Sequence, residues 1–241
     1  MNSKNALVFG GSKGIGYGVA KALKESGYKV AICGRNPDHL ETAKGKLKAD
    51  LVIAGDISKP GEPKRVIQEA KRCFGSLQAF VFNTGGPKQG RFADLSLQDF
   101  QDGYQILMGS LFESLQEILP DMKKDKYGRI AIISSLSGRE PIPNLLLSST
   151  FRSGLLGFTK SVADEYAPFN ITLNTVLPGL IDTERLRELG TPSEQLVKSV
   201  PAGRIGTTDE IGSFVATLLS EKTGYLTGQS IAFDGGKMRG F

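Results

Sequence analysis

The chain has 241 residues, 39% of them hydrophobic, and a formal net charge of +5. No stretch approaches the ~20 apolar residues that a membrane-spanning helix needs, and Met1–Asn5 leads into the first apolar run without a signal-like segment. The basic residues are interrupted by acids and are not interleaved with aromatic residues. These features argue against a nucleic-acid-binding or membrane protein, and we expect a cytoplasmic protein.

Short apolar runs alternate with longer amphipathic segments, which predicts strands alternating with helices. The predicted strands are Ala6–Phe9, Lys29–Cys33, Leu51–Ala54, Ala79–Phe82, Arg129–Ser134, Ile171–Val176 and Ser230–Phe233. The predicted helices are approximately Ile15–Glu25, Pro37–Lys48, Pro63–Phe74, Leu97–Lys124, Leu145–Ala167 and Asp209–Ser220, and Pro120 is expected to bend or restart the fourth. No repeat or linker divides the chain. We therefore predict one α/β domain, residues 1–241, with a Rossmann-type, doubly wound, parallel seven-stranded sheet and helices on both faces.

A glycine-rich turn joins the first predicted strand to the first predicted helix. Glycines permit a tight turn, let a pyrophosphate approach the backbone and let the helix pack closely on the strand. The free N–H groups at the start of the helix attract phosphate. A turn that binds nothing is the alternative, but the position between strand and helix favours a dinucleotide site. Its residues would be Gly10, Ser12, Lys13, Gly14, Ile15 and Gly16.

Two cations indicate which dinucleotide is bound. Arg35 follows the second predicted strand with no acid beside it, and Lys13 lies in the glycine-rich turn. An acid near this strand end binds the adenosine ribose hydroxyls, whereas an arginine accommodates a 2′-phosphate. We therefore predict NADP rather than NAD. The alternative is that Arg35 is an ordinary solvated loop residue.

Two further strand ends belong to the same predicted site. Asp56 and Ile57 follow the third strand, where Asp56 either accepts a hydrogen bond from the adenine amino group or caps the next helix. Asn83 and Gly85 end the fourth strand, at the sheet edge where such folds bind ligands. We assign all four residues to the cofactor site.

The remaining metal-binding residue types predict no metal site. Cys33 and Cys73 have neither metal nor redox spacing, and we expect two buried, reduced thiols. His39, the single histidine, lies in the predicted adenosine region and receives no role.

Together with later motifs, these residues resemble the short-chain dehydrogenase/reductase family, and within it the β-ketoacyl carrier-protein reductases, over essentially the whole length. The later motifs are Ile132-Ile133-Ser134-Ser135, Pro178-Gly179-Leu180-Ile181-Asp182-Thr183, Pro201-Ala202-Gly203-Arg204, Thr227-Gly228-Gln229 and Asp234-Gly235-Gly236. The resemblance implies that residues 1–135 form the cofactor-binding part. It also implies cofactor contacts from Pro178, Gly179, Ile181 and Thr183.

The resemblance also bears on the substrate and on assembly. A segment of about residues 180–205 would cover a small-molecule carbonyl substrate and set specificity. Arg185 and Arg187 in this segment suggest an acidic or phosphorylated substrate, with helix-surface charge as the alternative. The helices Leu97–Lys124 and Leu145–Ala167 would pack against their symmetry mates in a homodimer or homotetramer.

The chemistry of the resembled family depends on a serine, a tyrosine, a lysine and an asparagine, and three of these positions differ here. The serine corresponds to Ser135, which either orients the substrate carbonyl or caps the strand end. The tyrosine corresponds to Ser148, the lysine to Arg152 and the asparagine to Leu107. A serine hydroxyl is a far weaker acid than a phenol, and arginine cannot exchange protons at neutral pH. The chain resembles a divergent branch that lacks the standard tetrad, in which Arg152 still holds the nicotinamide ribose.

One carboxyl group is a candidate replacement acid. Glu140 lies in the loop after the fifth strand, and a carboxyl desolvated beside the substrate has a raised pKa. A surface carboxylate paired with Arg139 is the alternative. Tyr104, one helical turn before Leu107, is expected to be a core tyrosine with a satisfied hydroxyl.

Two functions remain open at this point. The first is an NADP-dependent carbonyl reductase, 3-oxoacyl-reductase-like, with a non-standard proton-delivery site that uses Glu140 or solvent. The second is a dinucleotide-binding sensor or assembly partner without turnover. Retention of Ser135 and of the motif from Pro178 to Thr183 favours the enzyme.

Overall fold

The computed structural model describes residues 4–187 and 193–240. Its parallel seven-stranded sheet has the order β3-β2-β1-β4-β5-β6-β7. The strands are β1 (Asn5–Phe9), β2 (Lys29–Gly34), β3 (Leu51–Ala54), β4 (Ala79–Asn83), β5 (Gly128–Ile133), β6 (Ile171–Pro178) and β7 (Ser230–Phe233). The chain adds strands outward from β1 and then from β4, so the winding reverses between these two. The predicted Rossmann-type fold is confirmed.

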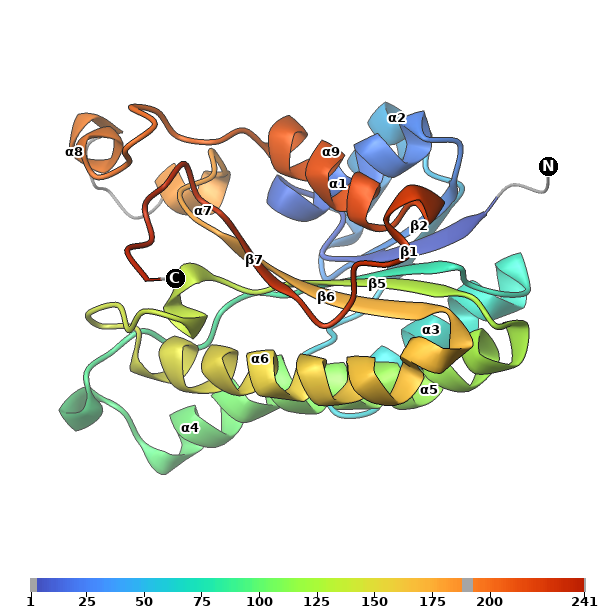
Figure 1. Ribbon diagram of the computed structural model, residues 1–241, viewed down its shortest axis with the longest axis horizontal. Helices are drawn as coiled ribbons and strands as arrows, with labels where there is room; N and C mark the ends of the chain where they lie inside the picture. The colour runs from blue at the N-terminus through green and yellow to red at the C-terminus, as the bar shows by residue number, and fades with distance from the viewer. Residues whose placement is uncertain (1–3, 188–192, 241) are drawn as a thin grey trace.

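Helices cover both faces of the sheet (Figure 1). One face packs against α1 (Gly14–Glu25), α2 (Pro37–Leu47) and α9 (Thr208–Leu218). The other packs against α3 (Glu62–Phe74), α5 (Ser110–Asp125) and α6 (Leu146–Tyr166). The short helices α7 (Glu184–Arg187) and α8 (Ser193–Lys198) follow β6, on the side of α9.

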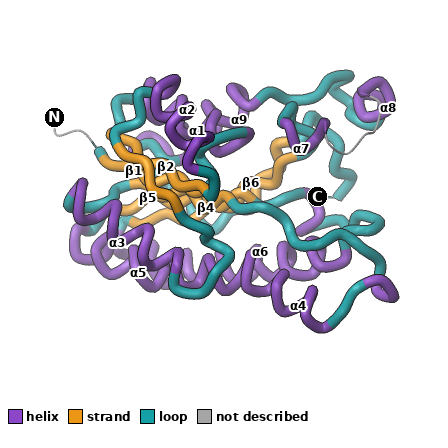
Figure 2. Tube along the Cα trace, turned by 180° about the vertical axis from the view of Figure 1, so that it is seen from behind, coloured by secondary structure: helices purple, strands orange, loops and turns teal. Residues whose placement is uncertain are grey.

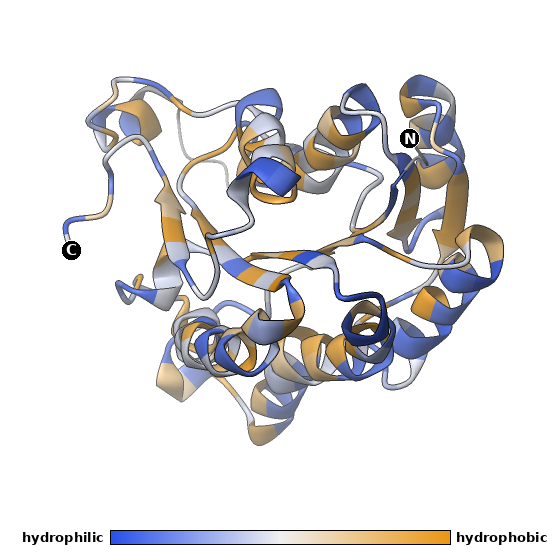
Figure 3. Cartoon of the chain, turned by 45° about the vertical axis from the view of Figure 1, so that its right-hand side comes forward, coloured by the Kyte–Doolittle hydropathy of each residue, from blue (hydrophilic) through white to orange (hydrophobic). Residues whose placement is uncertain are grey.

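The strands are buried from both sides, as expected for a parallel sheet between helical layers. Every residue of β5 and β6 is buried, and Figure 3 shows the strands as a largely apolar band. Seen from behind, β1, β2, β4 and β5 occupy the centre of the molecule between the two helical layers (Figure 2). This rigid centre fixes the positions of the loops at its carboxyl edge.

The long helix predicted over Leu97–Lys124 contains an irregularity that the sequence pattern did not reveal. It consists of α4 (Leu97–Tyr104) and α5, joined by a π-helical turn at Gln105–Gly109. The Ser110 hydroxyl donates a hydrogen bond to the Ile106 carbonyl at 2.6 Å in this turn. Pro120 does not restart the helix, because α5 continues through it to Asp125.

The two cysteines differ in burial, so the prediction of two buried thiols is wrong for one of them. Cys33 on β2 is buried, whereas Cys73 is exposed near the end of α3. Burial raises the pKa of the Cys33 thiol to about 12. Within the residues that the structure describes, no helix is long and apolar enough to cross a membrane.

Candidate functional site

A cavity of about 920 Å³ lies at the carboxyl edge of the sheet, where the winding reverses. Open sheets of this type bind ligands at this edge, and the volume is typical of small-molecule sites. Its lining brings together most of the predicted cofactor residues: Gly10, Ser12, Lys13, Gly14, Ile15, Arg35, Asp56, Ile57, Asn83, Gly85, Arg152 and Thr183. The predicted residues Gly16, Pro178, Gly179 and Ile181 are not part of the lining, and Ile181 borders a separate cavity of about 290 Å³.

The glycine-rich turn has a backbone geometry that requires glycine. Gly10 and Gly14 have positive φ angles of 60° and 58°, and a Cβ atom on Gly16 would overlap the Gly10 carbonyl oxygen. Helix α1 begins with no side-chain cap and no acid in its first turn. Its unpaired N–H groups and its dipole therefore favour an anion in the cavity.

Asn83 fastens the end of β4 to this turn, a role that the sequence analysis did not assign. Its amide nitrogen donates to the carbonyls of Phe9 and Gly10 at 3.2 and 3.4 Å. The turn is therefore held from the strand beside it, which keeps its backbone in place without a ligand.

At the adenosine end, Arg35 and His39 line the cavity beside the start of α2. Arg35 is exposed and forms no ion pair within residues 4–187 and 193–240. Asp56 accepts hydrogen bonds from the Ser58 backbone N–H and hydroxyl at 3.2 and 2.7 Å. Because α3 begins after Gly61, the alternative that Asp56 caps this helix is wrong.

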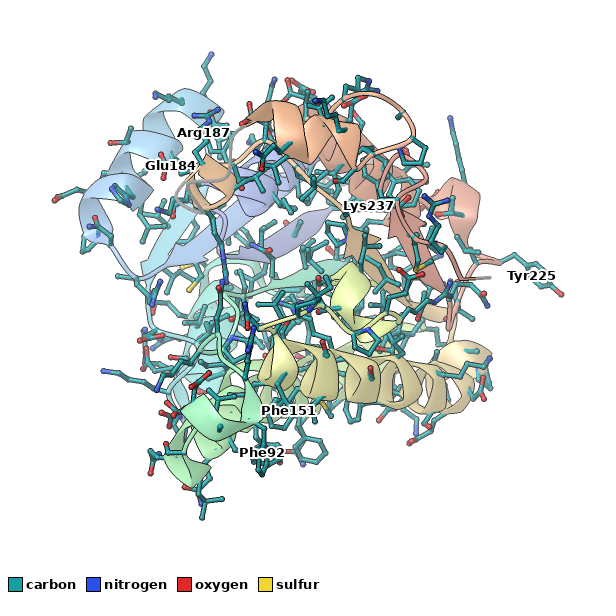
Figure 4. The ribbon with its side chains drawn as sticks, turned by 90° about the vertical axis from the view of Figure 1, so that its left-hand side faces the viewer. Phe92, Phe151, Glu184, Arg187, Tyr225 and Lys237 are labelled. Atoms are coloured by element: carbon teal, nitrogen blue, oxygen red, sulfur yellow. The ribbon has the colours of Figure 1, made fainter. Side chains whose placement is uncertain are left out.

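Lys13, predicted to face a phosphate, forms an ion pair with Glu184 of α7 at 3.0 Å. Figure 4 labels Glu184 and Arg187 on this short helix. Hydrogen bonding to Lys13 lowers the pKa of the Glu184 carboxyl. Both side chains of the ion pair line the cavity, so the segment after β6 contacts the glycine-rich turn across its mouth.

Arg152 lies on α6 with its guanidinium buried at the opposite end of the cavity lining. Its Nε donates to the Ser148 hydroxyl at 3.1 Å, and its Nη1 donates to the Ile133 carbonyl at 3.4 Å. Burial, together with the charge of Arg185, lowers the pKa of Arg152 to about 10. The group therefore stays cationic at neutral pH.

Ser148 is held away from the cavity, although it occupies the tyrosine position. Its hydroxyl accepts from Arg152 Nε and lies 3.1 Å from the Ser137 hydroxyl, and Ser148 is absent from the cavity lining. A serine oxygen that accepts from arginine has its own proton available for Ser137. In this geometry Ser148 positions Arg152.

Two adjacent serines end β5, and they differ in what they contact. Ser135 caps the following turn, because its oxygen accepts from the Ser137 backbone N–H at 3.2 Å, and it does not line the cavity. Ser134 does line the cavity, and its buried hydroxyl has no hydrogen-bond partner among the described residues. The sequence analysis missed Ser134, since only its neighbour matched the position of the family serine.

The position of the family asparagine is occupied by an apolar side chain, that of Leu107. Leu107 is fully buried and packs with Leu147 and Phe151. Tyr104 is not the expected core tyrosine, because half of it is exposed and its ring contacts the edge of Phe151. The π-helical turn instead brings Ile106 into the cavity lining.

Glu140 matches neither of its two predicted roles. Its carboxylate accepts from the backbone N–H groups of Arg239 and Gly240 at 2.6 and 2.8 Å, and it does not line the cavity. Arg139 donates instead to the Ser230 carbonyl at 2.8 Å. Glu140 therefore holds the C-terminal segment in place.

The segment of about residues 180–205 contributes two arginines with different environments. Arg187 forms a two-pronged ion pair with Asp182, with both distances 3.0 Å. Arg185 lines the cavity beside Gly86, where a Cβ atom would lie 2.8 Å from Arg185 Nη2. Residues 188–192 of this segment lie outside the described residues. Within the described part, no group of three or more His, Cys, Asp or Glu residues could hold a metal ion.

A reversing parallel sheet with an uncapped glycine-rich helix start at its carboxyl edge defines a Rossmann-type protein with a nucleotide-sized cavity. Residues 10–237 match the sequence family described as Enoyl-(Acyl carrier protein) reductase. The chain is 32% identical to the 3-oxoacyl-[acyl-carrier-protein] reductase FabG of Staphylococcus epidermidis, over 97% of this chain and 98% of the relative. This chain belongs to the short-chain dehydrogenase/reductase family.

Other relatives extend the comparison. The NADPH-dependent reductase BacG of Bacillus subtilis is 28% identical over 99% of both chains. A crystal structure of YwfH, an NADPH-dependent reductase involved in bacilysin biosynthesis, superposes with a TM-score of 0.96 at 28% identity and covers 100% of both chains. A 3-oxoacyl (acyl-carrier-protein) reductase of Agrobacterium tumefaciens C58 with NADP bound gives 0.91 at 27% identity, covering 97% of this chain and 93% of that one.

Proposed function

We propose that this protein is an NADP-dependent oxidoreductase that reduces a small-molecule carbonyl compound and uses Arg152 in place of the family lysine. The observation that carries the proposal is the composition of the large cavity. A glycine-rich phosphate turn and Arg35 lie at one end, and a buried arginine beside an unpartnered serine hydroxyl lies at the other. This is the arrangement expected where a dinucleotide and a substrate meet.

The residues present fit NADP. Gly16 has no room for a Cβ atom, and the start of α1 has no side-chain cap. The pyrophosphate can therefore approach the backbone closely. Arg35, free of any acid among the described residues, suits the 2′-phosphate. BacG is described as NADPH-dependent, and the structure of the Agrobacterium reductase contains bound NADP. Both relatives support the same cofactor. We assign its binding to residues 1–135 and to Thr183 with its neighbours.

When bound, NADPH supplies a hydride to the carbonyl carbon, and the protein positions the acceptor. A rotation of its side chain would let the buried, unpartnered hydroxyl of Ser134 donate to the carbonyl oxygen. The Arg152 charge stabilises the negative charge that develops on this oxygen, and low surrounding polarity strengthens the effect. The oxygen then takes its proton from water, because Arg152 keeps its proton at neutral pH and Ser148 lies outside the cavity.

Ser135, Ser148 and Glu140 take supporting roles in this proposal. Ser135 caps the turn after β5, and Ser148 holds Arg152 Nε. Glu140 holds the C-terminal segment. Residues of about 180–205 act as the substrate cover, since Glu184 and Arg185 line the cavity from above the sheet.

A dinucleotide-binding sensor or assembly partner without turnover is the second candidate. Leu107 fills the asparagine position with hydrocarbon, and Ser148 is separated from the cavity. Both features are expected of a site that has lost proton transfer. Turnover distinguishes the two functions, because a sensor would bind NADPH and oxidise none of it with any carbonyl compound.

We also propose a homodimer or homotetramer in the cytoplasm that binds neither nucleic acid nor membrane. Large apolar side chains remain exposed along α4 and α5, among them Leu97, Phe100 and Phe112 at 74%, 43% and 50%. A second copy of the chain would cover them.

The first experiment is a thermal-shift comparison of NADPH, NADP, NADH and NAD at equal concentrations. A ligand at ~100 times its Kd adds about 2.7 kcal/mol, which raises Tm by roughly 5–10 °C for a chain of this size. We expect this shift for the phosphorylated pair alone, and we expect Arg35→Ala to abolish the preference. Exposed Arg72 on α3 provides a matched control as Arg72→Ala. Equal shifts with all four nucleotides would remove the role of Arg35, and no shift with any would end the proposal.

A further inference from the structure

The cations in and beside the large cavity differ in whether an acid neutralises them. Lys13 pairs with Glu184, and Arg187 pairs with Asp182. Arg152 and Arg185 also line the cavity or its rim, yet neither forms an ion pair within the part of the chain that the structure describes. With Arg35, the cavity therefore presents three guanidinium groups that have no ion pair among the described residues, and Arg35 is already assigned to the 2′-phosphate.

Arg152 needs an anionic partner more than Arg185 does, because only 6% of its surface is exposed. Its Nε and Nη1 have acceptors in Ser148 and Ile133, but among the described residues its Nη2 has none. Burying a cation without an anion is costly. The charge of Arg185 acts in the same direction, because it further disfavours the cationic form of Arg152.

Arg185 extends from α7 to the opposite wall. Its Nη2 lies so close to Gly86 that a Cβ atom there would come within 2.8 Å. Glycine at this position therefore leaves the space that the guanidinium uses. Ile106 and Ile133 also line the cavity, and apolar walls strengthen the attraction between a guanidinium and an anion.

The anions of NADP have their own partners in the proposed function. The start of α1 suits the pyrophosphate, and Arg35 suits the 2′-phosphate, at the other end of the lining. Arg152 and Arg185 are thus left for an anion that the cofactor does not supply. Ser134 directly follows Ile133 and also lines the cavity, so a polar residue lies next to the strand end that Arg152 contacts.

The geometry points to a substrate that carries a carboxylate, bound between Arg152 and Arg185, with its reacting carbonyl beside Ser134. The chemical class is a short oxo acid, since one cluster of donors serves both groups. Guanidinium groups bind carboxylates through paired, charge-assisted hydrogen bonds. This inference rests on the proposed function, because it identifies the substrate class of the same site.

The test measures binding of acetoacetate and of methyl acetoacetate to the complex of the full chain with NADP⁺, by isothermal titration calorimetry. The oxidised cofactor prevents turnover, and the ester differs from the acid only in lacking the charge. We expect acetoacetate to bind about 10- to 100-fold more tightly than the ester. Arg185→Gln and Arg152→Gln should each remove most of this preference, and Arg185→Gln should leave ester binding unchanged. Arg187→Gln, on the same helix but already paired with Asp182, should keep it.

Each other outcome overturns a defined part. Equal binding of the acid and the ester overturns the inference alone. So does the absence of acetoacetate binding at concentrations far above ~1 mM, which is the upper range of common KM values. A preference that survives in both glutamine variants does the same. If Arg185→Gln weakens NADP⁺ binding as much as acetoacetate binding, the arginine serves the cofactor phosphates. If NADP⁺ itself fails to bind the unmodified protein, the proposed function fails first.

Discussion

Arg152 is supported by a serine one helical turn away on α6, and the two positions act together. A lysine ammonium is a point charge, whereas the planar guanidinium can donate to Ser148 through Nε and to Ile133 through Nη1 at the same time. Ser148 thus provides an acceptor that a tyrosine directed into the cavity would not. The departures at these two family positions have a common structural explanation, which is a buried cation fixed against β5.

The cost of this cation can be measured. We expect Arg152→Met to stabilise the ligand-free protein at pH 7 by about 1–3 kcal/mol, because it removes a buried charge that has no anionic partner in the part of the chain that the structure describes. For a chain of this size each kcal/mol raises Tm by roughly 2–4 °C. Differential scanning calorimetry of the variant and of the exposed control Arg72→Met, expected within about ±0.5 kcal/mol, would decide the point.

The pH dependence follows from the lowered pKa of Arg152. Folding lowers the pKa of Arg152 to about 10, so the unfolded chain binds the proton more tightly than the folded one. The penalty is therefore complete below the lowered pKa of about 10 and disappears as the pH rises from there toward the ordinary pKa of an arginine. The stability gap between Arg152→Met and the unmodified protein should narrow in this window. A gap of the opposite sign at pH 7 would mean that Arg152 stabilises the fold.

At the scale of elements, α1 and α9 approach so closely that their contact depends on two glycines. A Cβ atom on Gly18 would overlap the Thr208 carbonyl oxygen, and one on Gly212 would overlap the Gly18 carbonyl oxygen. This contact matters for the site, because α1 carries the phosphate turn at its start. Glycine here has a packing role that its modest helix propensity would not suggest.

We expect Gly212→Ala to destabilise the protein by about 1–3 kcal/mol, because the added methyl forces the two backbones apart. Chemical denaturation measures this change, and the midpoint should fall. Gly45→Ala on α2 is the matched control, since no atom lies within 4 Å of its added Cβ. There the better helix former should stabilise by about 0.5–1 kcal/mol. A stabilising effect at Gly212 would show that the helices have room to separate.

The π-helical turn between α4 and α5 also belongs to the element scale. It directs Ile106 to the cavity while Leu107 packs with Leu147 and Phe151. Such single-turn irregularities often occur at functional sites. The apolar periodicity over Leu97–Lys124 correctly predicted a helix. It could not reveal the π-helical turn, because a wider turn of only five residues hardly changes the spacing of the apolar residues.

For the whole molecule, the exposed apolar surface on α4 and α5 bears on assembly. Phe112 is half exposed, and its ring contacts Phe158 of α6. We expect the protein to elute as a dimer or tetramer, and Phe112→Glu to shift it toward the monomer, because a charge in an apolar interface is desolvated without a partner. Size-exclusion chromatography with light scattering measures the mass. Lys46→Glu on α2, on the other face of the sheet, should leave it unchanged, and a monomeric unmodified protein would contradict the assembly.

The sequence by itself determined the fold and the cofactor end of the site. Buried parallel strands are continuous apolar runs, so the order of strands and helices could be read directly. The glycine-rich turn, Arg35, Asp56 and Asn83 could be placed together because each follows a strand, and parallel strands end at one edge. These signals are local, and their consequences follow from the topology.

Only the tertiary structure decided what the substrate end contains. Glu140 accepts hydrogen bonds from the C-terminal segment, and Ser148 accepts one from Arg152. Ser134, and not Ser135, lines the cavity. The pairing of Arg187 with Asp182, and the lack of an acidic partner for Arg185 among the described residues, likewise depend on the position of α7. A residue's position in the chain gives its chemistry, but hydrogen-bond partners and burial depend on residues far away in the sequence, and these set the direction of a side chain and the cost of its charge.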